Sequence, residues 1–307
     1  MKYYYNSGNS ICINQSIYPG IKTTDDLFDV LQYCWTEQTC TERLRTKFSD
    51  KNKTAGQCAI TSFLVQDIFG GDIYGLDTGR GKHWYNVVDG IIFDLTSAQF
   101  GEEAKNLKYD LSFKLNSRED IWNQTGKKER YLLLKENLNR VLPKTISVNN
   151  NQFDVLCLLG HGKGGYSYLA VDSSGKKFVV KQIHHEPCSY YSFGDKIQSE
   201  INDYERLKKT GIPIPLMIDV DKKSERILKE FIDGPTIAKL VKLGKMKVDY
   251  INQVEEMCRI LYASNTNIDY YPTNFVVQNE KLFYIDYECN DYMQEWDFEH
   301  WGKQYWI

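Results

Sequence analysis

The spacing of apolar residues predicts two helices in the first third of the chain. Residues 23–26, Thr-Thr-Asp-Asp, precede a run with helical spacing at 27–35, so we expect a capped helix there. Apolar residues recur at helical spacing over 59–69, and Gly70-Gly71 ends this second helix. The polar stretch 41–55 between them predicts a short helix followed by a loop.

Three residues of the types found in cysteine nucleophile sites lie at the ends of predicted helices and strands. Cys58 opens the second helix, where free N–H groups and the helix dipole favour a thiolate. His83 begins a predicted strand and Asp94 ends the next one, with Asp89-Gly90 at the hairpin turn between them. A lone Cys or His is usually structural, but the three together predict a nucleophile, its base and the group that orients the base. Gln57 is a candidate oxyanion donor.

The middle of the chain is polar and charged. Residues 102–126 are rich in turn-forming sequence, and residues 127–142 carry a leucine stripe that predicts a helix ended by Pro143. A charged helix with one apolar face usually packs against its neighbours, so we interpret this one as a connector and assign it no chemistry.

A glycine-rich pattern opens the second half. It has the form G-x-G-x-x-G and consists of Gly160, Gly162 and Gly165. In a dinucleotide-binding domain this pattern leads from a strand into a helix. Here an alternating strand, a turn at 172–176 and a further strand follow, so the pattern predicts a β-hairpin of the kind that covers ATP phosphates.

Charged residues downstream fit the same interpretation. Lys181 lies on the third predicted strand, where it would bind the α- and β-phosphates. Residues 196–210 predict a helix, and we expect Glu200 to pair with Lys181. Glu205 is the alternative, because the sequence does not fix the phase of the helix. The strand that follows resembles a kinase hinge, which implies that the backbone from Glu230 to Ile232 contacts adenine.

Asp269, Asn274 and Asp286 flank a predicted hairpin with its turn at 278–280. The hairpin would bring them to one end, where carboxylates and an amide bind Mg²⁺ and orient a hydroxyl. We expect Asp269 to position the acceptor hydroxyl, and Asn274 and Asp286 to bind Mg²⁺. The run His184-His185-Glu186 also contains metal-binding types, but no matching Cys or His follows it, so we favour a solvated loop.

Two resemblances to known families follow from these motifs. Residues 10–105 resemble papain-like and transglutaminase-like cysteine hydrolases, and more closely the small uncharacterised bacterial YunG-like family, in the strings G-x-C-A-x-T, GG, DG and D-L-T-x-x-Q-F. This resemblance implies that Cys58, His83 and Asp94 form a catalytic triad, although Trp follows the His directly here. Residues 152–307 resemble minimal kinase-like domains of the RIO and aminoglycoside-phosphotransferase type, which implies ATP and Mg²⁺ as cofactors.

The second half also departs from the kinase pattern. Asn267-Ile268 replaces the usual His-Arg, and residues 286–288, Asp-Tyr-Glu, replace Asp-Phe-Gly, as in phosphotransferases that act on small molecules. Lys229 stands before the hinge, where an apolar residue is expected. Only 21 residues follow Asp286 in the 307-residue chain, so we expect a shortened C-terminal lobe on which the aromatic-rich segment 293–307 docks.

The expected fold class is therefore α+β. It comprises a cysteine-hydrolase-like domain over 1–110, a helical connector over 111–148 and a kinase-like domain over 149–307. The leading hypothesis is an ATP- and Mg²⁺-dependent phosphotransferase fused to a Cys-His-Asp hydrolase-like domain. The alternatives are a thiol hydrolase or transamidase regulated by a nucleotide-binding pseudokinase domain, and a non-enzymatic binding protein.

Composition narrows the range of partners. The net charge is −3, so no broad basic surface indicates nucleic acid or anionic lipid. Eight scattered cysteines without a C-x-x-C pair indicate reduced thiols, and no apolar run resembles a signal peptide or a membrane span. We expect a cytoplasmic protein that binds ATP and an unidentified phosphate acceptor, either a small molecule or a protein, but neither nucleic acid nor membrane.

Overall fold

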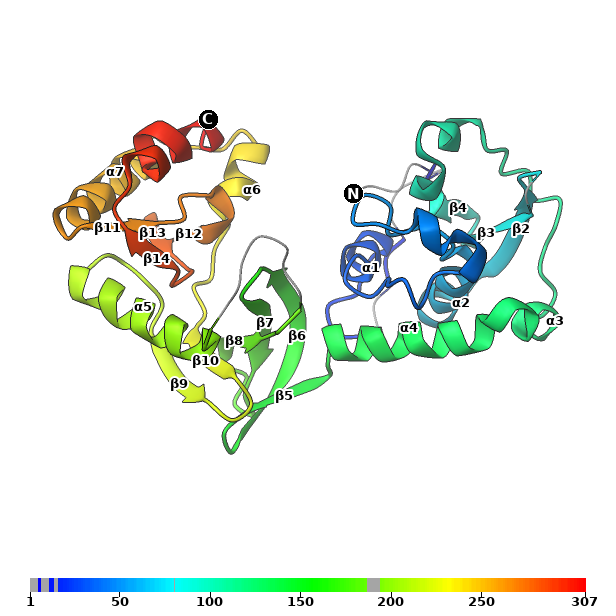
Figure 1. Cartoon of the computed structure of the whole chain (residues 1–307), viewed down its shortest axis with the longest axis horizontal. Coiled ribbons are helices and arrows are strands. Elements are labelled where there is room, and N and C mark those ends of the chain that lie inside the picture. The colour runs from blue at the N-terminus through cyan, green and yellow to red at the C-terminus, as the bar shows by residue number, and fades with distance from the viewer. Residues whose placement is uncertain (1–4, 7–10, 14–15, 80, 187–193) are drawn as a thin grey trace. The chain divides into compact units, whose positions relative to one another are not determined.

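The computed structural model describes residues 5–6, 11–13, 16–79, 81–186 and 194–307 (Figure 1). The chain divides into two compact units, one of Met1–Thr145 with Val155–Leu158 and one of Ile146–Asp154 with Leu159–Ile307. Both contain helices and antiparallel strands, so the expected mixture of α and β structure is confirmed. No helix in the described ranges is long and apolar enough to cross a bilayer.

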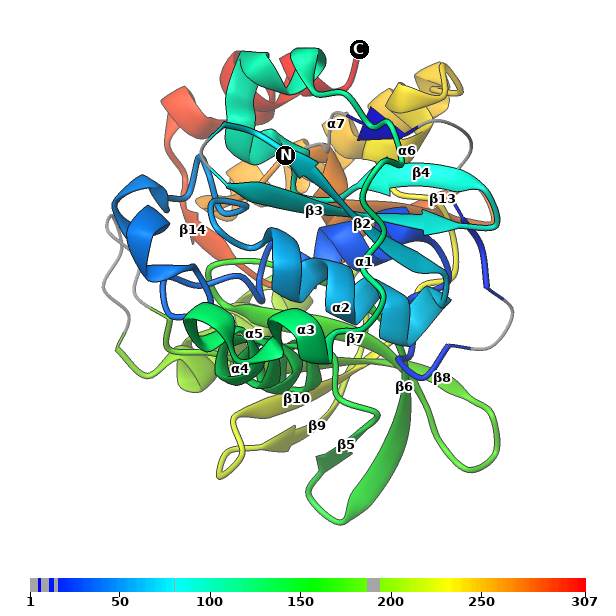
Figure 2. The ribbon, with the colours of Figure 1, turned by 90° about the vertical axis from the view of Figure 1, so that its right-hand side faces the viewer.

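The N-terminal unit is built on a four-stranded sheet of order β1-β4-β3-β2 (Figure 2). Its strands are β1 (Tyr5–Asn6), β2 (Asp72–Asp77), β3 (Lys82–Val88) and β4 (Ile91–Asp94). Its helices are α1 (Thr24–Leu31), α2 (Cys58–Phe69), α3 (Glu119–Trp122) and α4 (Lys127–Val141), with 3-10 segments at Glu42–Lys47, Ser97–Asn106 and Gln124–Gly126.

Local signals in the sequence account for several of these boundaries. Thr23 caps α1, because its side chain accepts the N–H of Asp26 while the Asp26 carboxylate accepts the N–H of Thr23. Helix α2 ends at Gly70, whose φ of 75° lies in the left-handed region that glycine adopts without strain. Asp89 and Gly90 join β3 to β4 with φ of 49° and 76°, as the predicted hairpin turn requires.

Helix α2 is buried between the sheet and α4. It contacts β2 and β3 on one side and α4 on the other. On the α4 side, Tyr131 meets the Phe63 ring of α2 edge to face, with 5.9 Å between the ring centroids. The helix that we interpreted as a connector is therefore part of the core that positions the first residue of α2.

The C-terminal unit is built on a six-stranded sheet of order β5-β6-β7-β8-β10-β9 (Figure 1). The strands are β5 (Thr145–Val148), β6 (Asn151–His161), β7 (Gly165–Val171), β8 (Lys177–Ile183), β9 (Met217–Asp221) and β10 (Arg226–Glu230). Helix α5 (Lys196–Thr210) lies on one face of this sheet, where Ile197 and Ile201 pack with Ile183 and Ile227.

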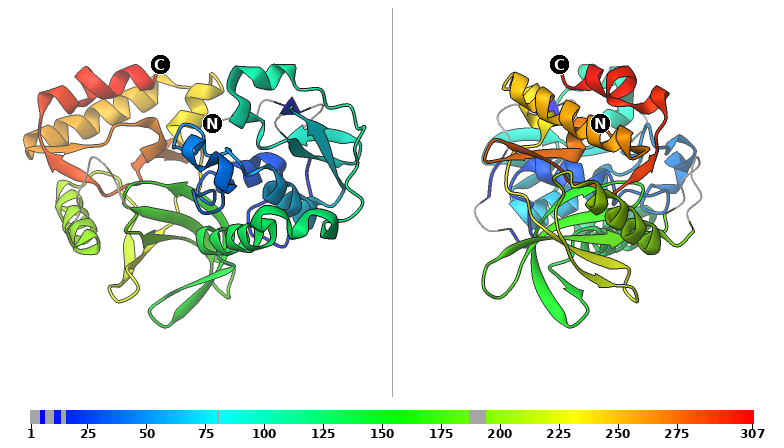
Figure 3. Two further views of the ribbon diagram at one scale, coloured as in Figure 1. Left: turned by 45° about the vertical axis from the view of Figure 1, so that its right-hand side comes forward. Right: turned by 90° about the vertical axis from the view of Figure 1, so that its left-hand side faces the viewer.

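The rest of this unit is a cluster of helices and short strands (Figure 3). It comprises α6 (Ile237–Lys242), α7 (Val248–Ala263), β11 (Thr266–Ile268) paired with β14 (Cys289–Asp291), β12 (Phe275–Gln278) paired with β13 (Lys281–Tyr284), and short 3-10 or π segments at Pro272–Asn274, Gln294–Trp296, Phe298–Gly302 and Lys303–Tyr305. Phe298 and Trp306 are buried in one cluster with Val254 and Leu261 of α7, so the predicted docking of the aromatic-rich end is confirmed.

Candidate functional site

The structure brings Cys58, His83 and Asp94 together in the N-terminal unit. Cys58 is the first residue of α2, and the other two lie on the neighbouring strands β3 and β4. His83 Nε2 lies 2.5 Å from Asp94 Oδ2, and the Cys58 thiol is hydrogen-bonded to His83 and to the backbone of Trp84. His83 and Asp94 are buried, whereas Cys58 as a residue is partly exposed.

Asp94 is fixed by hydrogen bonds on both of its oxygens. The N–H and the hydroxyl of Thr96 each donate to Oδ1 at 2.9 Å, and the Tyr109 hydroxyl donates to Oδ2 at 2.8 Å. A carboxylate that accepts several hydrogen bonds stays ionised. It also fixes the ring orientation of the histidine beside it.

The three groups shift one another's pKa. Burial opposes a charged ring, but Asp94 and Cys58 together raise the pKa of His83 to about 10. Burial likewise opposes a thiolate, but the hydrogen bond and charge of His83 lower the pKa of Cys58 below its ordinary value. The pKa of Asp94 is also lowered, because the charge of His83 outweighs the effect of burial. These shifts favour the ion pair of thiolate and imidazolium over the neutral pair, and a thiolate is the reactive form of a cysteine nucleophile.

The Gln57 side chain does not fit the oxyanion role considered for it. Gln57 is fully buried, and its amide N–H donates to the carbonyl of Thr36 at 3.1 Å. The amide is thus committed to a backbone group away from the thiol. The N–H groups at the start of α2 remain the natural donors there, because the first intrahelical bond is donated by Thr61 to the Gln57 carbonyl.

Two residues that the sequence did not identify support the turn before Cys58. Gln99 Oε1 accepts the N–H of Gly56 at 3.4 Å, and Gln99 Nε2 lies 3.3 Å from His83 Nδ1. Arg130 Nη1 of α4 donates to the Gly56 carbonyl at 3.2 Å and to the Thr39 carbonyl at 3.0 Å. Gln99 lies in the string shared with the YunG-like family, whereas nothing in the sequence of α4 signals the role of Arg130.

A second group of charged residues surrounds Lys181 in the C-terminal unit. Its Nζ contacts the Glu200 carboxylate and lies 3.3 Å from Asp286 Oδ1. Glu205, the alternative partner, faces Lys208 at 3.9 Å instead. Burial opposes the charge on Lys181, but the two carboxylates raise its pKa, so the ammonium is retained.

Asp269, Asn274 and Asp286 lie at the open end of the β12–β13 hairpin. The side-chain N–H of Asn274 donates to the Asp269 carbonyl at 3.3 Å, and the Asn274 carbonyl accepts the N–H of Ile285 at 2.9 Å. Burial opposes ionisation of Asp286, but Lys181 and Lys229 depress its pKa far below the ordinary range.

The glycines around the β6–β7 turn have different steric surroundings. A Cβ on Gly165 would lie 2.4 Å from a backbone oxygen of β8, so packing requires glycine there. Gly160 and Gly162 face open space. Gly164, which the pattern does not include, lies beside the ion pair, because its Cβ would be 3.6 Å from Lys181 Nζ.

Lys229 is buried on β10 beside the same group. Its Nζ donates to the Ile285 carbonyl at 2.7 Å and lies 3.7 Å from the centroid of the Tyr287 ring. Burial, and to a smaller extent the charge of Lys181, lower the pKa of Lys229 to about 8. At the end of β10, the N–H of Glu230 donates to the Leu216 carbonyl at 2.9 Å, in the loop that precedes β9.

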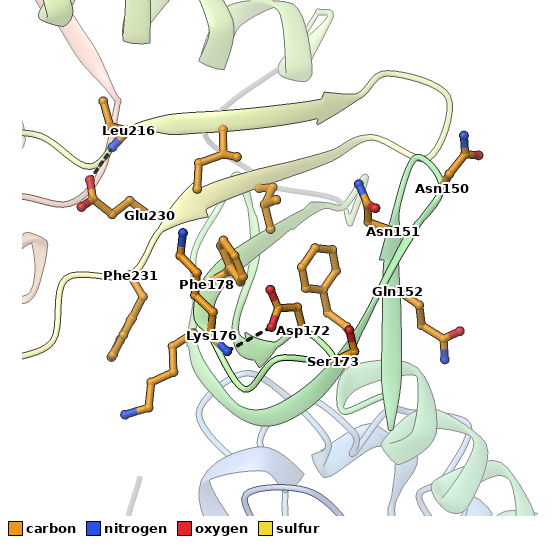
Figure 4. Close-up of a pocket in the computed structure, with 14 residues that line it drawn as sticks. Asn150, Asn151, Gln152, Asp172, Ser173, Lys176, Phe178, Leu216, Glu230 and Phe231 are labelled. Atoms are coloured by element: carbon orange, nitrogen blue, oxygen red, sulfur yellow. Dashed lines mark hydrogen bonds between the residues drawn. The ribbon is translucent and has the colours of Figure 1, made fainter.

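A pocket of about 770 Å³ opens on the six-stranded sheet (Figure 4). Phe178, Leu228 and Glu230 are among the residues that line it. Side chains alternate between the two faces of a strand, so these residues face away from Lys181 and Lys229. The pocket is therefore not the expected ATP site.

The residues around Cys58 have counterparts in known proteins. The stretch 23–143 matches a family model. That family is YunG. The uncharacterized protein YunG of Bacillus subtilis (strain 168) is 29% identical over 111 residues, which cover 36% of this chain and 87% of that protein. The expected YunG-like resemblance is confirmed for this stretch, and it extends past residue 105 to include α4.

A second relative is the EKC/KEOPS complex subunit bud32 of Dictyostelium discoideum. It is 28% identical over 123 residues, which cover 38% of this chain. The chain spans about half of that relative, 48% of its length.

Proposed function

We propose that the C-terminal unit is a kinase-like domain with a shortened C-terminal lobe that binds ATP with Mg²⁺ and transfers a phosphoryl group to an acceptor. The observation that carries the proposal is the position of Lys181, whose Nζ contacts both Glu200 and Asp286. A lysine held between a helix carboxylate and a metal-binding carboxylate is suited to bind the α- and β-phosphates. The acceptor is a small molecule or a protein.

The remaining residues take separate roles in this proposal. The turn with Gly160, Gly162 and Gly165 would cover the phosphates, and the backbone of residues 230–232 would contact adenine. Asp269 would accept a hydrogen bond from the acceptor hydroxyl and position it for attack.

Asn274 and Asp286 fit Mg²⁺, which prefers oxygen ligands. The Asn274 amide nitrogen is engaged with the Asp269 carbonyl, so the amide oxygen is the atom left for a cation. Asp286 is ionised, as described above, and supplies the charge. When bound, Mg²⁺ would neutralise phosphate charge.

Thermal melting with and without Mg–ATP tests this proposal. A ligand at a hundred times its Kd adds about 2.7 kcal/mol, which raises the melting temperature by several degrees. We expect the shift in the wild type and its loss in Asp286→Ala. Asp291→Ala is the matched control, because that carboxylate is exposed on β14 and pairs with Arg206. Absence of a shift in the wild type would contradict nucleotide binding.

We further infer that the N-terminal unit is a papain- or transglutaminase-like thiol hydrolase or transamidase. The thiolate of Cys58 would attack an acyl carbonyl to form a thioester, while imidazolium His83 gives its proton to the leaving group. Water or an amine would then release the acyl group, with His83 taking up the proton. The observation that favours this function is the buried His83–Asp94 pair beside Cys58 at the first position of α2.

Iodoacetamide labelling near pH 7, read out by peptide mass spectrometry, tests the second activity. Cys58 should react at least about tenfold faster than Cys12, which is an exposed thiol. His83→Gln should remove this advantage, because the thiolate loses its main stabilising partner. Equal rates for the two cysteines in the wild type would rule out an activated nucleophile.

The two tests together separate the alternatives. A melting shift without transfer to any acceptor, combined with a reactive Cys58, would favour a thiol enzyme regulated by nucleotide. Failure of both tests would favour a non-enzymatic binding protein.

A further inference from the structure

Three metal-binding side chains gather at the end of the glycine-rich hairpin. His161 is the last residue of β6, His184 follows β8 directly, and Glu186 comes two residues later. Their ligand atoms all lie within 4.8 Å of one another, and each side chain is partly buried. The pairing of Gly165 with Ile183 explains the gathering, because it sets the β6–β7 turn beside the end of β8.

The His184 ring is oriented as the ring of a metal ligand usually is. Its Nε2 lies 2.9 Å from the Gly162 carbonyl, and its Nδ1 faces the backbone N–H of Glu186 at 3.2 Å. Nε2 therefore carries the proton, and the Nδ1 lone pair accepts the Glu186 N–H, a hydrogen bond that a bound ion would replace. A second-shell carbonyl that fixes the tautomer in this way is typical of metal-bound histidine.

The other two side chains are oriented toward the same point. The Tyr166 hydroxyl donates to Glu186 Oε1, which leaves Oε2 facing His161 Nε2 at 3.3 Å. The His161 and His184 rings are stacked with 4.8 Å between centroids and 12° between planes. Two imidazoles and a carboxylate thus approach one another from the end of β6 and from the segment that follows β8.

Helix α5 fixes the backbone on both sides of this group. The buried Lys196 ammonium donates to the His184 carbonyl at 2.5 Å and to the Lys163 carbonyl at 3.2 Å. The turn and the end of β8 are therefore held together before any ion binds.

We propose that His161, His184 and Glu186 bind a divalent transition-metal ion of the Zn²⁺ class, which ties the glycine-rich turn to the end of β8. Imidazole ligands favour such ions over Mg²⁺. Small side-chain rotations bring the three ligand atoms to the bond lengths of about 2.0–2.2 Å that Zn²⁺ takes, and water fills a fourth position. This site is distinct from the Mg²⁺ ligands Asn274 and Asp286, and it does not depend on the proposed phosphotransfer.

The proposal has one consequence for the nucleotide. His161 stands between Gly160 and Gly162, in the turn that we place over the phosphates. An ion bound to it would restrict that turn, so Zn²⁺ should change the affinity for Mg–ATP.

Calorimetric titration with Zn²⁺ after treatment with EDTA tests the site. The titrations use a Cys58→Ser background, so that the thiol of the N-terminal unit does not bind the ion. We expect one Zn²⁺ per chain, no comparable binding of Mg²⁺, and affinity at least about a hundredfold lower in His161→Gln and in Glu186→Gln. The matched control is His185→Gln, because His185 is exposed and faces Glu225 at 2.6 Å.

The outcomes are separable from those of the nucleotide tests, because no ATP is present. Retention of Zn²⁺ binding by His185→Gln with its loss in His161→Gln supports the site. Equal affinity in the wild-type site and in His161→Gln, or no saturable Zn²⁺ binding, would show that the three side chains form only a hydrogen-bonded cluster. Melting curves of each variant in EDTA identify any that fail to fold, and Glu186→Gln then serves as the second test.

Discussion

The two candidate sites hold buried charge in different ways. At Cys58, the hydrogen bond and charge of His83 lower the pKa of the thiol, while Asp94 and Cys58 raise the pKa of His83 to about 10. At Lys181, carboxylates on both sides preserve an ammonium, while Lys229 beside it has a pKa lowered to about 8 by burial. The first site favours opposite charges on two neighbouring side chains, whereas in the second site burial weakens proton binding by Lys229.

This difference gives the two sites different pH responses. The pKa of Cys58 is lowered in the folded chain, so its contribution to stability rises with pH, whereas the pKa of His83 is raised to about 10, so its contribution falls as pH rises from about 6.5 to 10. The two contributions therefore oppose each other. Lys229 binds its proton more weakly when folded, so its contribution to stability rises with pH from about 8 to 10.5.

The largest effect that we expect is in the C-terminal unit. Asp269→Asn should lower phosphoryl transfer by about 10²–10⁴-fold, because the acceptor hydroxyl loses the group that positions it and accepts its proton. The Mg–ATP melting shift should persist, since Asp269 is not assigned to the nucleotide. Transfer at the wild-type rate in this variant would show that the residue is misassigned.

A smaller effect tests the pH comparison directly. Lys229→Met replaces the buried ammonium by an apolar side chain of similar length. Relative to this variant, the wild type should gain about 2 kcal/mol of stability as pH rises from 8 to 10, measured by urea unfolding. A constant difference across that range would show that Lys229 titrates at its ordinary pKa.

The smallest effect concerns Asp94. Tyr109→Phe removes one donor, but both hydrogen bonds from Thr96 remain. We expect a loss of about 1 kcal/mol in stability and a few-fold slower iodoacetamide labelling of Cys58 near pH 7. Tyr74→Phe on β2 of the same sheet serves as the control. If both variants label alike, the Tyr109 hydroxyl does not contribute to thiol activation.

Sequence reasoning succeeded where the signal was local. Capping residues and glycines located α1, α2 and the β3–β4 turn, because each depends on residues close in the chain. The group of Cys58, His83 and Asp94 could be proposed for the same reason, since α2, β3 and β4 follow one another closely.

Local pattern says less where the partner lies far away in the chain or where side-chain direction decides. The sequence favoured Glu200 over Glu205, as the contact with Lys181 has it, but only the phase of α5 settles the choice, and the Gln57 amide turns to Thr36. The support from Arg130 has no sequence signal, because α4 reaches Gly56 only through packing. The proximity of His161 to His184 and Glu186 is likewise a tertiary feature that their sequence positions do not show.

The alternation of side chains along β8 constrains how this protein can change. Phe178 lines the pocket on one face, and three residues later Lys181 meets the carboxylates on the other. One residue inserted between them would set both side chains on the same face of the sheet, so that either the ring or the ammonium would lose its place. We therefore expect added residues to be tolerated in the turn at 172–176 but not inside β8. In a library of single-residue insertions, variants with the insertion in that turn should fold, whereas variants with the insertion inside β8 should not.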